Sequence, residues 1–225
     1  MAPPRAGSRA RTPLGEHLAP RRQPVQERAK KTVELILDTA AALIEEVGLE
    51  AFNTNVLADR AQVRVRTVYR YFPNKLAIIT ALAERLAEEW DRWFDGFRGL
   101  SDPQADWRAL WSAYVDSFVD GIHRTQGGLA IRRAMRALPE LEMLERRDNE
   151  RLARQLAAAL ARRGVAMSRT RLTVAARVLI ETAVSVLDLA LIEPPAQARS
   201  LVEELKHLQL AYLAAYIEPR TKDAR

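Results

Sequence analysis

Apolar residues recur at three- and four-residue steps along most of the chain, which is the spacing of amphipathic α-helices. The first such run covers residues 27–47 and stops at Gly48, and glycine commonly terminates helices. Two short runs follow at 54–61 and 65–72, and a longer helix with an aromatic-rich apolar stripe begins after Asn74. No alternation of apolar and polar residues lasts long enough to build a sheet. The pattern therefore predicts an all-α protein of about nine helices.

Helix-capping and helix-breaking residues set the expected boundaries. The asparagines Asn53 and Asn74 each precede a predicted helix, where they can accept its first backbone N–H groups. Proline favours the first helical turn, glycine favours the position after the last turn, and cations favour the negative C-terminal end. These rules place helix starts at Asp102-Pro103 and Pro139, a break at Gly127-Gly128, a helix end at Arg162-Arg163-Gly164 and a break at Pro194-Pro195.

Charge is distributed unevenly along the chain. The net charge is +6, and the first 31 residues contain eight Arg or Lys against two Asp or Glu, which accounts for the whole excess. Residues 1–24 also contain five prolines and can bury little surface, so we expect a disordered basic arm there. A basic arm on a chain whose remaining acidic and basic residues balance favours a polyanionic partner such as DNA. A solvated tail that binds nothing specific has the same composition.

The composition argues against several classes of protein. The absence of cysteine excludes disulfides and thiolate metal sites and agrees with a cytoplasmic location. The most apolar segment is interrupted by Arg177, Glu181 and Asp188, which favours a buried helix over a membrane span. The histidines match no metal-ligand spacing, and neither a Gly-x-Ser-x-Gly elbow nor a Gly-x-x-x-x-Gly-Lys loop is present. We therefore expect no enzyme activity, no catalytic residues, no metal and no cofactor.

The segment VLADRAQVRVRTVYRYFPNK, residues 56–75, concentrates arginine and tyrosine on two short helices. Their length and tight connection are typical of a helix-turn-helix, whose second helix enters the DNA major groove. Base edges there offer N7, O6 and exocyclic amines, so the reading face needs long donors or small polar groups. Val68 and Phe72 lie four residues apart and are expected to face the core. The expected base-reading residues are Arg64, Arg66, Thr67 and Arg70.

The stretch TNVLADRAQVRVRTVYRYFPNK resembles the DNA-binding signature of the TetR family of transcriptional regulators. That signature is roughly T-x-x-I-A-x-x-A-G-V-S-x-x-T-[LVI]-Y-x-[HY]-F-x-[SN]-K, and the resemblance covers about residues 27–85. Three positions depart from it: Leu57 replaces Ile, Gln62 stands at the usual Gly, and Arg64 replaces the capping Ser or Thr. The matching residues are Thr54, Ala58, Ala61, Val63, Thr67, Val68, Tyr69, Tyr71, Phe72, Asn74 and Lys75.

The resemblance implies DNA contacts for individual residues. Segment 64–70 is expected to read bases, with Asn55 as a further contributor. Other interpretations stay open at three positions: Tyr69 can pack against the first helix, Asn74 can serve only as a cap, and Arg70 can reach phosphate instead of a base. The residues expected to contact phosphate are Thr54, Tyr69, Tyr71 and Lys75.

Aromatic residues lie at helical spacing on the next two predicted helices. They can form ordinary core, or they can enclose an apolar cavity of the kind that binds small molecules. The TetR resemblance favours the cavity, because members of that family typically bind an inducer between these helices. His123 and Arg133 are candidate polar members, although His123 can also cap a helix and Arg133 can lie at the surface. The candidate aromatic lining residues are Trp90, Trp93, Phe97, Trp111, Tyr114 and Phe118.

The predicted helix 169–192 is apolar around most of its circumference, apart from a narrow polar stripe that includes Ser185. One small domain can cover only part of such a helix. Together with the last helix it suggests an antiparallel pair that packs on its copy as a four-helix bundle, and the TetR resemblance implies the same homodimer. A monomer with a well-covered core helix is the alternative. The candidate interface residues are Leu187, Leu205, Tyr212 and Leu213.

These features divide the chain into the arm, a helix-turn-helix DNA-binding domain at 25–75, and a helical ligand-binding and dimerisation domain at 76–220. The expected protein is a ligand-responsive transcriptional regulator, preferably a repressor. It binds an inverted repeat in double-stranded DNA as a dimer, responds to an apolar small molecule and has no membrane partner. The alternative is an architectural, sequence-tolerant DNA-binding protein without an inducer, which would show steep salt dependence and little sequence discrimination.

Overall fold

The computed structural model describes residues 26–93 and 97–218. These residues form nine α-helices and one 3₁₀ turn without any strand, which confirms the all-α prediction. The predicted arm, residues 1–24, lies outside the described residues. The elements are α1 (Glu27–Ala51), α2 (Thr54–Arg60), α3 (Val65–Tyr71), α4 (Lys75–Trp93), η1 (Arg98–Ser101), α5 (Trp107–Arg124), α6 (Gly128–Ala137), α7 (Pro139–Arg163), α8 (Arg169–Ala190) and α9 (Pro195–Ile217).

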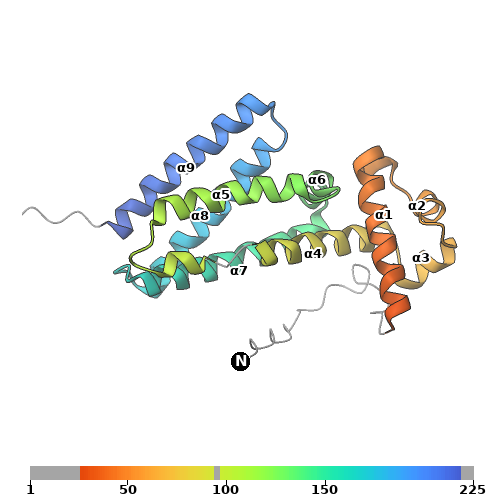
Figure 1. Ribbon diagram of the computed structural model, residues 1–225, viewed down its shortest axis with the longest axis horizontal. Helices are drawn as coiled ribbons and strands as arrows, with labels where there is room; N and C mark the ends of the chain where they lie inside the picture. Colours follow the sequence, from red (N-terminus) through yellow and green to blue (C-terminus); the bar gives the residue numbers. More distant parts are fainter. Residues whose placement is uncertain (1–25, 94–96, 219–225) are drawn as a thin grey trace, which may run out of the picture.

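Two groups of helices are joined by α4 (Figure 1). Helices α1, α2 and α3 lie together at one end of the molecule, while α5, α7, α8 and α9 form an elongated bundle at the other. Helix α4 leaves the first group and runs along the bundle, and the short helix α6 lies where the bundle meets α1. The two groups are therefore in direct contact through both α4 and α6.

Side-chain caps explain where α2 and α4 begin. The Asn53 side chain accepts hydrogen bonds from the backbone N–H groups of Asn55 and Val56 at 3.1 and 3.0 Å, which starts α2. Asn74 accepts from the backbone N–H of Ala77 at 2.8 Å and starts α4 in the same way. These bonds satisfy donors that a helix N-terminus otherwise leaves unpaired. Both predicted asparagine caps are confirmed.

Two predicted positions after α4 are wrong. The helix expected to start at Asp102-Pro103 begins only at Trp107, capped by Asp106. Arg163 of α7 donates to the carbonyl oxygen of Asp102 at 2.6 Å and to that of Ala105 at 3.0 Å, which holds this segment out of a helix. Phe97, predicted on the stripe of the preceding helix, instead lies after the end of α4 with a left-handed φ of +63°.

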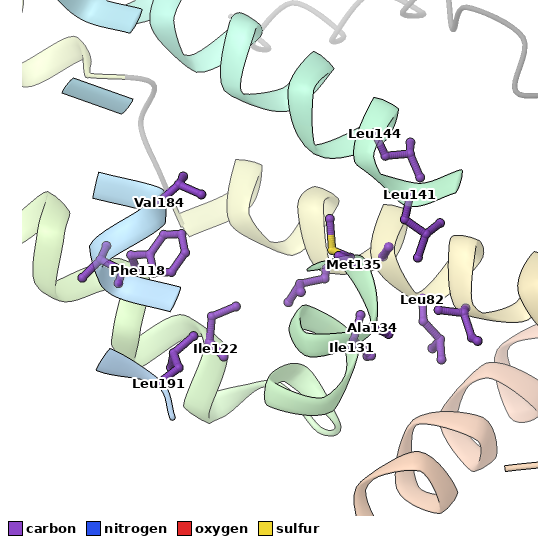
Figure 2. Close-up of a cluster of buried hydrophobic side chains, with 14 of the residues drawn as sticks. Leu82, Phe118, Ile122, Ile131, Ala134, Met135, Leu141, Leu144, Val184 and Leu191 are labelled. Carbon is purple, nitrogen blue, oxygen red and sulfur yellow. The ribbon is translucent and has the colours of Figure 1, made fainter. Parts of the chain in front are cut away.

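Apolar side chains from α4, α5, α6, α7 and α8 meet in one region of the core (Figure 2). Leu82 of α4, Met135 of α6 and Leu141 of α7 lie on one side of this region, and Phe118 of α5 and Val184 of α8 lie on the other. All five side chains are buried. Burial of an apolar side chain of this size contributes about 1.5–3 kcal/mol. The helix groups are thus held together by a continuous apolar core.

Part of the polar stripe of α8 is directed at α6 and α7 instead of at solvent. Arg132 of α6 donates to Asp188 at 2.6 Å and to Glu145 of α7 at 2.7 Å, and all three side chains are nearly buried. Farther along α8, Asn149 of α7 donates to Glu181 at 3.0 Å. Burial opposes the charge on Arg132, but its bonds to Asp188 and Glu145 outweigh that effect and raise its pKa. This cluster fixes α6 and α7 against α8.

Candidate nucleic-acid interface and internal cavity

The outward face of α3 gathers the donors expected to read DNA. Val68 and Phe72 are buried and anchor α3 to the core, so the opposite side of the helix is exposed. Neither the Arg64 nor the Arg66 side chain has an ion-pair or hydrogen-bond partner within the part of the chain that the structure describes. The depression on this face is lined by Arg64, Arg66, Thr67, Tyr69 and Arg70.

Two residues expected at phosphates are held next to this face. The hydroxyl groups of Thr54 and Tyr69 are hydrogen-bonded to each other at 2.9 Å, which links α2 to α3. Tyr69 is 40% exposed, which argues against the interpretation that it packs under α1. Asn55, at the first turn of α2, is also exposed. These side chains are accessible to a DNA backbone or base without any rearrangement of the helices.

Tyr71 and Lys75, also expected at phosphates, point inward in this structure. Tyr71 is buried, and its hydroxyl accepts a hydrogen bond from Arg70 Nη2 at 2.9 Å. The Lys75 ammonium donates to the carbonyl oxygen of Leu49 at 2.5 Å and lies 5.7 Å from the centre of the Phe52 ring. Both residues therefore stabilise the packing of α1, α2 and α3. Any contact with a phosphate would be an additional role.

Two ion pairs that the sequence pattern did not reveal orient α2 and α4 on α1. Arg60 of α2 makes two hydrogen bonds to the Glu46 carboxylate, at 2.6 and 3.2 Å, and they lower the pKa of Glu46. Arg85 of α4 pairs with Asp38 of α1. The partners lie far apart in sequence, so helical periodicity carries no signal for them. Exposed pairs of this kind contribute little stability, but they favour one orientation of α2 and α4 relative to α1.

An internal cavity lies among the aromatic side chains of the bundle. Its volume is about 70 Å³, well below the ~300–1,000 Å³ of typical ligand pockets. The rings of Trp90 and Phe118 meet edge to face with centroids 4.1 Å apart, and Phe97 and Trp111 stack at 6.0 Å. The cavity brings together five of the predicted aromatic residues, which are Trp90, Phe97, Trp111, Tyr114 and Phe118.

Three other residues predicted to line the cavity do not contribute described side chains to it. His123, in the last turn of α5, is exposed, and it is absent from the cavity wall. Arg133 is also exposed and lines a separate surface groove between α6 and α8. The side chain of Trp93 lies outside the described residues. Among described residues, the wall of the cavity is therefore less polar than predicted.

Gln209 of α9 is a member of the cavity wall that sequence reasoning missed. It is completely buried, and its Oε1 accepts a hydrogen bond from Trp111 Nε1 at 3.1 Å. Its Nε2 donates to the carbonyl oxygen of Leu179 at 2.8 Å and to the Thr182 hydroxyl at 3.0 Å. The available signal was a glutamine on the apolar side of the last helix. Its amide joins α5, α8 and α9 behind the cavity.

Three of the four predicted dimer residues are buried inside the protomer. Leu187 and Leu213 are each only 1% exposed and Leu205 is 3% exposed, so none of them can contact a second copy. Leu187 instead lines the internal cavity. Tyr212 is half-buried and packs edge to face on Tyr216. The large apolar residues of α8, α9 and the turn between them that are exposed are Val174, Val178, Leu189, Ile192 and Leu208.

Sequence comparison matches two family models to this chain. The model described as "Bacterial regulatory proteins, tetR family" matches residues 36–82, which include α2 and α3. The model described as "Tetracyclin repressor-like, C-terminal domain" matches residues 106–213, which include the bundle helices α5 to α9. The chain belongs to the TetR family. This is a family of transcriptional regulators and not of enzymes.

Individual TetR-family relatives match parts of the chain. The repressor KstR of Rhodococcus jostii is 42% identical over 67 residues, 30% of this chain and 28% of the relative. The class C tetracycline repressor of Escherichia coli is 29% identical over 110 residues, 48% of each protein. The chain thus spans less than half the length of these relatives. A crystal structure of a TetR-family regulator from Streptomyces coelicolor is 26% identical, with a TM-score of 0.58 over 82% of this chain and 99% of that one.

The TetR signature explains two unusual features of the turn before α3. Gln62 stands at the usual glycine and has a φ of +53°, in the left-handed region. A residue with a Cβ atom costs about 1–2 kcal/mol there. Arg64 occupies the N-cap of α3 and makes no capping hydrogen bond from its side chain. Both departures weaken the turn, while Arg64 adds a cation to the exposed face.

Residues 26–93 and 97–218 contain neither a metal-binding cluster nor a membrane-spanning helix. No group of three or more His, Asp or Glu side chains in these ranges could hold a metal ion. No helix within them is both long and apolar enough to cross a membrane.

Proposed function

We propose that this TetR-family protein is a transcriptional repressor that binds an inverted repeat in double-stranded DNA as a homodimer. A small apolar molecule would lower its affinity for that DNA. The observation that carries the proposal is the exposed face of α3, where three arginines, Thr67 and Tyr69 converge on one depression of a helix-turn-helix. A target on the bacterial chromosome would place the protein in the cytoplasm.

Different side chains would contact bases and phosphates. The guanidinium groups of Arg64 and Arg66 are suited to paired hydrogen bonds with guanine O6 and N7, and Thr67 and Asn55 suit shorter contacts. Arg70 uses one nitrogen on the Tyr71 hydroxyl and keeps other N–H groups for a base or a phosphate. The linked hydroxyls of Thr54 and Tyr69 would contact a phosphate, and Lys75 and Tyr71 would contribute after small side-chain rotations.

The exposed apolar side of α8 and α9 supports the homodimer. Val178 is 44% exposed and Leu208 is 60% exposed, and both lie on the two helices that would form a four-helix bundle with their copies. A twofold axis through this bundle would place two α3 helices on one face, about 34–36 Å apart for adjacent major grooves. A wild-type mass of one chain in light scattering at micromolar concentration would refute the dimer.

Helix α4 supports a coupling between ligand and DNA. Its first residue, Lys75, donates a hydrogen bond to the carbonyl oxygen of Leu49 near the end of α1. Trp90, near the other end of α4, lines the internal cavity. A ligand that enlarges the cavity would therefore shift α4 and change the separation of the two α3 helices. Such a shift requires the ligand to bind one arrangement better than the other. Couplings of about 1–3 kcal/mol are typical.

Selection of binding sites from a random DNA pool tests the proposal. We expect one enriched inverted repeat, bound far more tightly than random DNA. Arg66→Ala should relax the preference at particular positions, whereas Arg154→Ala, which removes an exposed arginine of α7, should change nothing. Equal affinity for enriched and random DNA, with a steep salt dependence, would favour the architectural alternative instead.

A further inference from the structure

A second small cavity adjoins the apolar one. Its volume is about 60 Å³, and it lies among α4, α5, α6, α7 and α8. Trp90, Phe118, Leu152 and Val184 line both cavities, so the perpendicular pair of Trp90 and Phe118 rings stands between them. The second cavity differs from the first in having charged side chains in its wall, and Arg132, Glu145, Asp148 and Arg151 supply them.

The indole N–H of Trp90 is a buried donor that lacks an acceptor. Its Nε1 atom is shielded from solvent and has no hydrogen-bond partner in the part of the chain that the structure describes. Trp111, on the other side of the apolar cavity, has its Nε1 bonded to Gln209. Buried N–H groups are nearly always paired in folded proteins, because an unpaired one loses its hydrogen bond to water. The Trp90 donor is therefore the group in this wall that still requires an oxygen or nitrogen acceptor.

The charges around the second cavity are already compensated. Arg132 pairs with Asp188 and Glu145, and Arg151 lies 3.5 Å from Asp148. An ionised ligand group placed there would have to compete with these pairs after losing its own hydration. A neutral acceptor would need only the Trp90 N–H. The wall therefore favours a neutral polar group over a carboxylate or an ammonium.

We propose that the ligand of this protein is a neutral, mainly apolar compound with one carbonyl or ether oxygen that accepts a hydrogen bond from Trp90 Nε1. This inference rests on the proposed ligand-responsive function and names the class of ligand. The apolar body occupies the cavity beside Trp111 and Phe118, and the oxygen lies at the junction of the two cavities.

The size of the cavities sets a requirement for binding. Even together, at about 130 Å³, they are smaller than the ~150 Å³ cavity that holds one benzene molecule, so a ligand of two rings must both join and enlarge them. Separation of the Trp90 and Phe118 rings would join the cavities and would also uncover the Nε1 atom. Ligand entry and formation of the hydrogen bond are thus the same movement, and Trp90 lies on α4, the helix that leads back to Lys75.

Three probes of similar shape test the ligand class. Diphenylmethane has no acceptor, benzophenone adds a neutral carbonyl oxygen, and diphenylacetate adds an ionised carboxylate. In titration calorimetry the wild-type protein should bind benzophenone about fivefold to tenfold more tightly than diphenylmethane, and diphenylacetate most weakly. Trp90→Phe should abolish the preference for benzophenone, because it removes the N–H and keeps an aromatic ring.

Trp111→Phe is the matched control. It removes an indole N–H from the same cavity, but that N–H is already bonded to Gln209 and is not offered to a ligand. The ratio of the two affinities should therefore stay at its wild-type value in Trp111→Phe. Equal binding of benzophenone and diphenylmethane by the wild type, a preference that survives Trp90→Phe, or no binding of any probe would overturn the inference. Binding with the predicted preference but without any change in DNA affinity would leave the inference standing and refute the proposed coupling.

Discussion

Replacement of Gln62 by glycine is expected to stabilise the helix-turn-helix. Gln62 is exposed and has a φ of +53°, and its backbone N–H donates to the carbonyl oxygen of Asp59 at 3.1 Å. Glycine keeps this backbone bond and removes the Cβ clash, which is worth about 1–2 kcal/mol. Its greater freedom in the unfolded chain costs about 0.5–1 kcal/mol. The expected net gain is about 0.5–1 kcal/mol for Gln62→Gly.

Hydrogen exchange of the α2 and α3 amides measures this gain where it arises. A stabilisation of 0.5–1 kcal/mol should slow exchange in these helices about twofold to fivefold. Amides of α7 and α8 provide an internal reference. Gln62→Ala is the control variant, because alanine keeps the Cβ atom and should leave exchange nearly unchanged. Faster exchange in Gln62→Gly than in Gln62→Ala would show that the left-handed turn stores no strain.

The remaining predictions concern DNA binding, assembly and the buried ion cluster. Arg66→Ala and Arg70→Ala should each weaken binding of the selected DNA by about 1–3 kcal/mol without changing the circular dichroism spectrum. Deletion of residues 1–24 should lower affinity and make the plot of log affinity against log salt shallower in filter binding, and an unchanged slope would exclude the arm from the interface. Val178→Glu should give folded monomers in light scattering, because Val178 is exposed in the protomer. Asp188→Asn should lower the free energy of unfolding by about 3 kcal/mol in urea, because it leaves Arg132 incompletely paired.

The sequence by itself determined the features that depend on neighbouring residues. Helix caps act within three or four residues, so Asn53 and Asn74 could be identified as caps without knowledge of the fold. Gly48 could be identified in the same way as a break, and the structure shows a non-helical backbone at this residue that kinks α1 before its last turn. The helix-turn-helix was recognisable for the same reason, since its spacing and its buried Val68 and Phe72 lie within one short segment. Local rules failed at Asp102, because a cap signal there is overridden by the distant Arg163.

Only the tertiary structure decided which apolar faces are covered. Leu187 and Val178 lie on the same helix, have similar chemistry and are about 180° apart around it. Leu187 is buried at the internal cavity, while Val178 remains exposed. The hydrophobic pattern of α8 indicates that most of its circumference is suited to burial, but it does not specify whether a helix of the same chain or a second protomer covers each face. That choice depends on contacts of α8 with α7 and α9, which lie elsewhere in the sequence and leave no periodic signal within α8 itself.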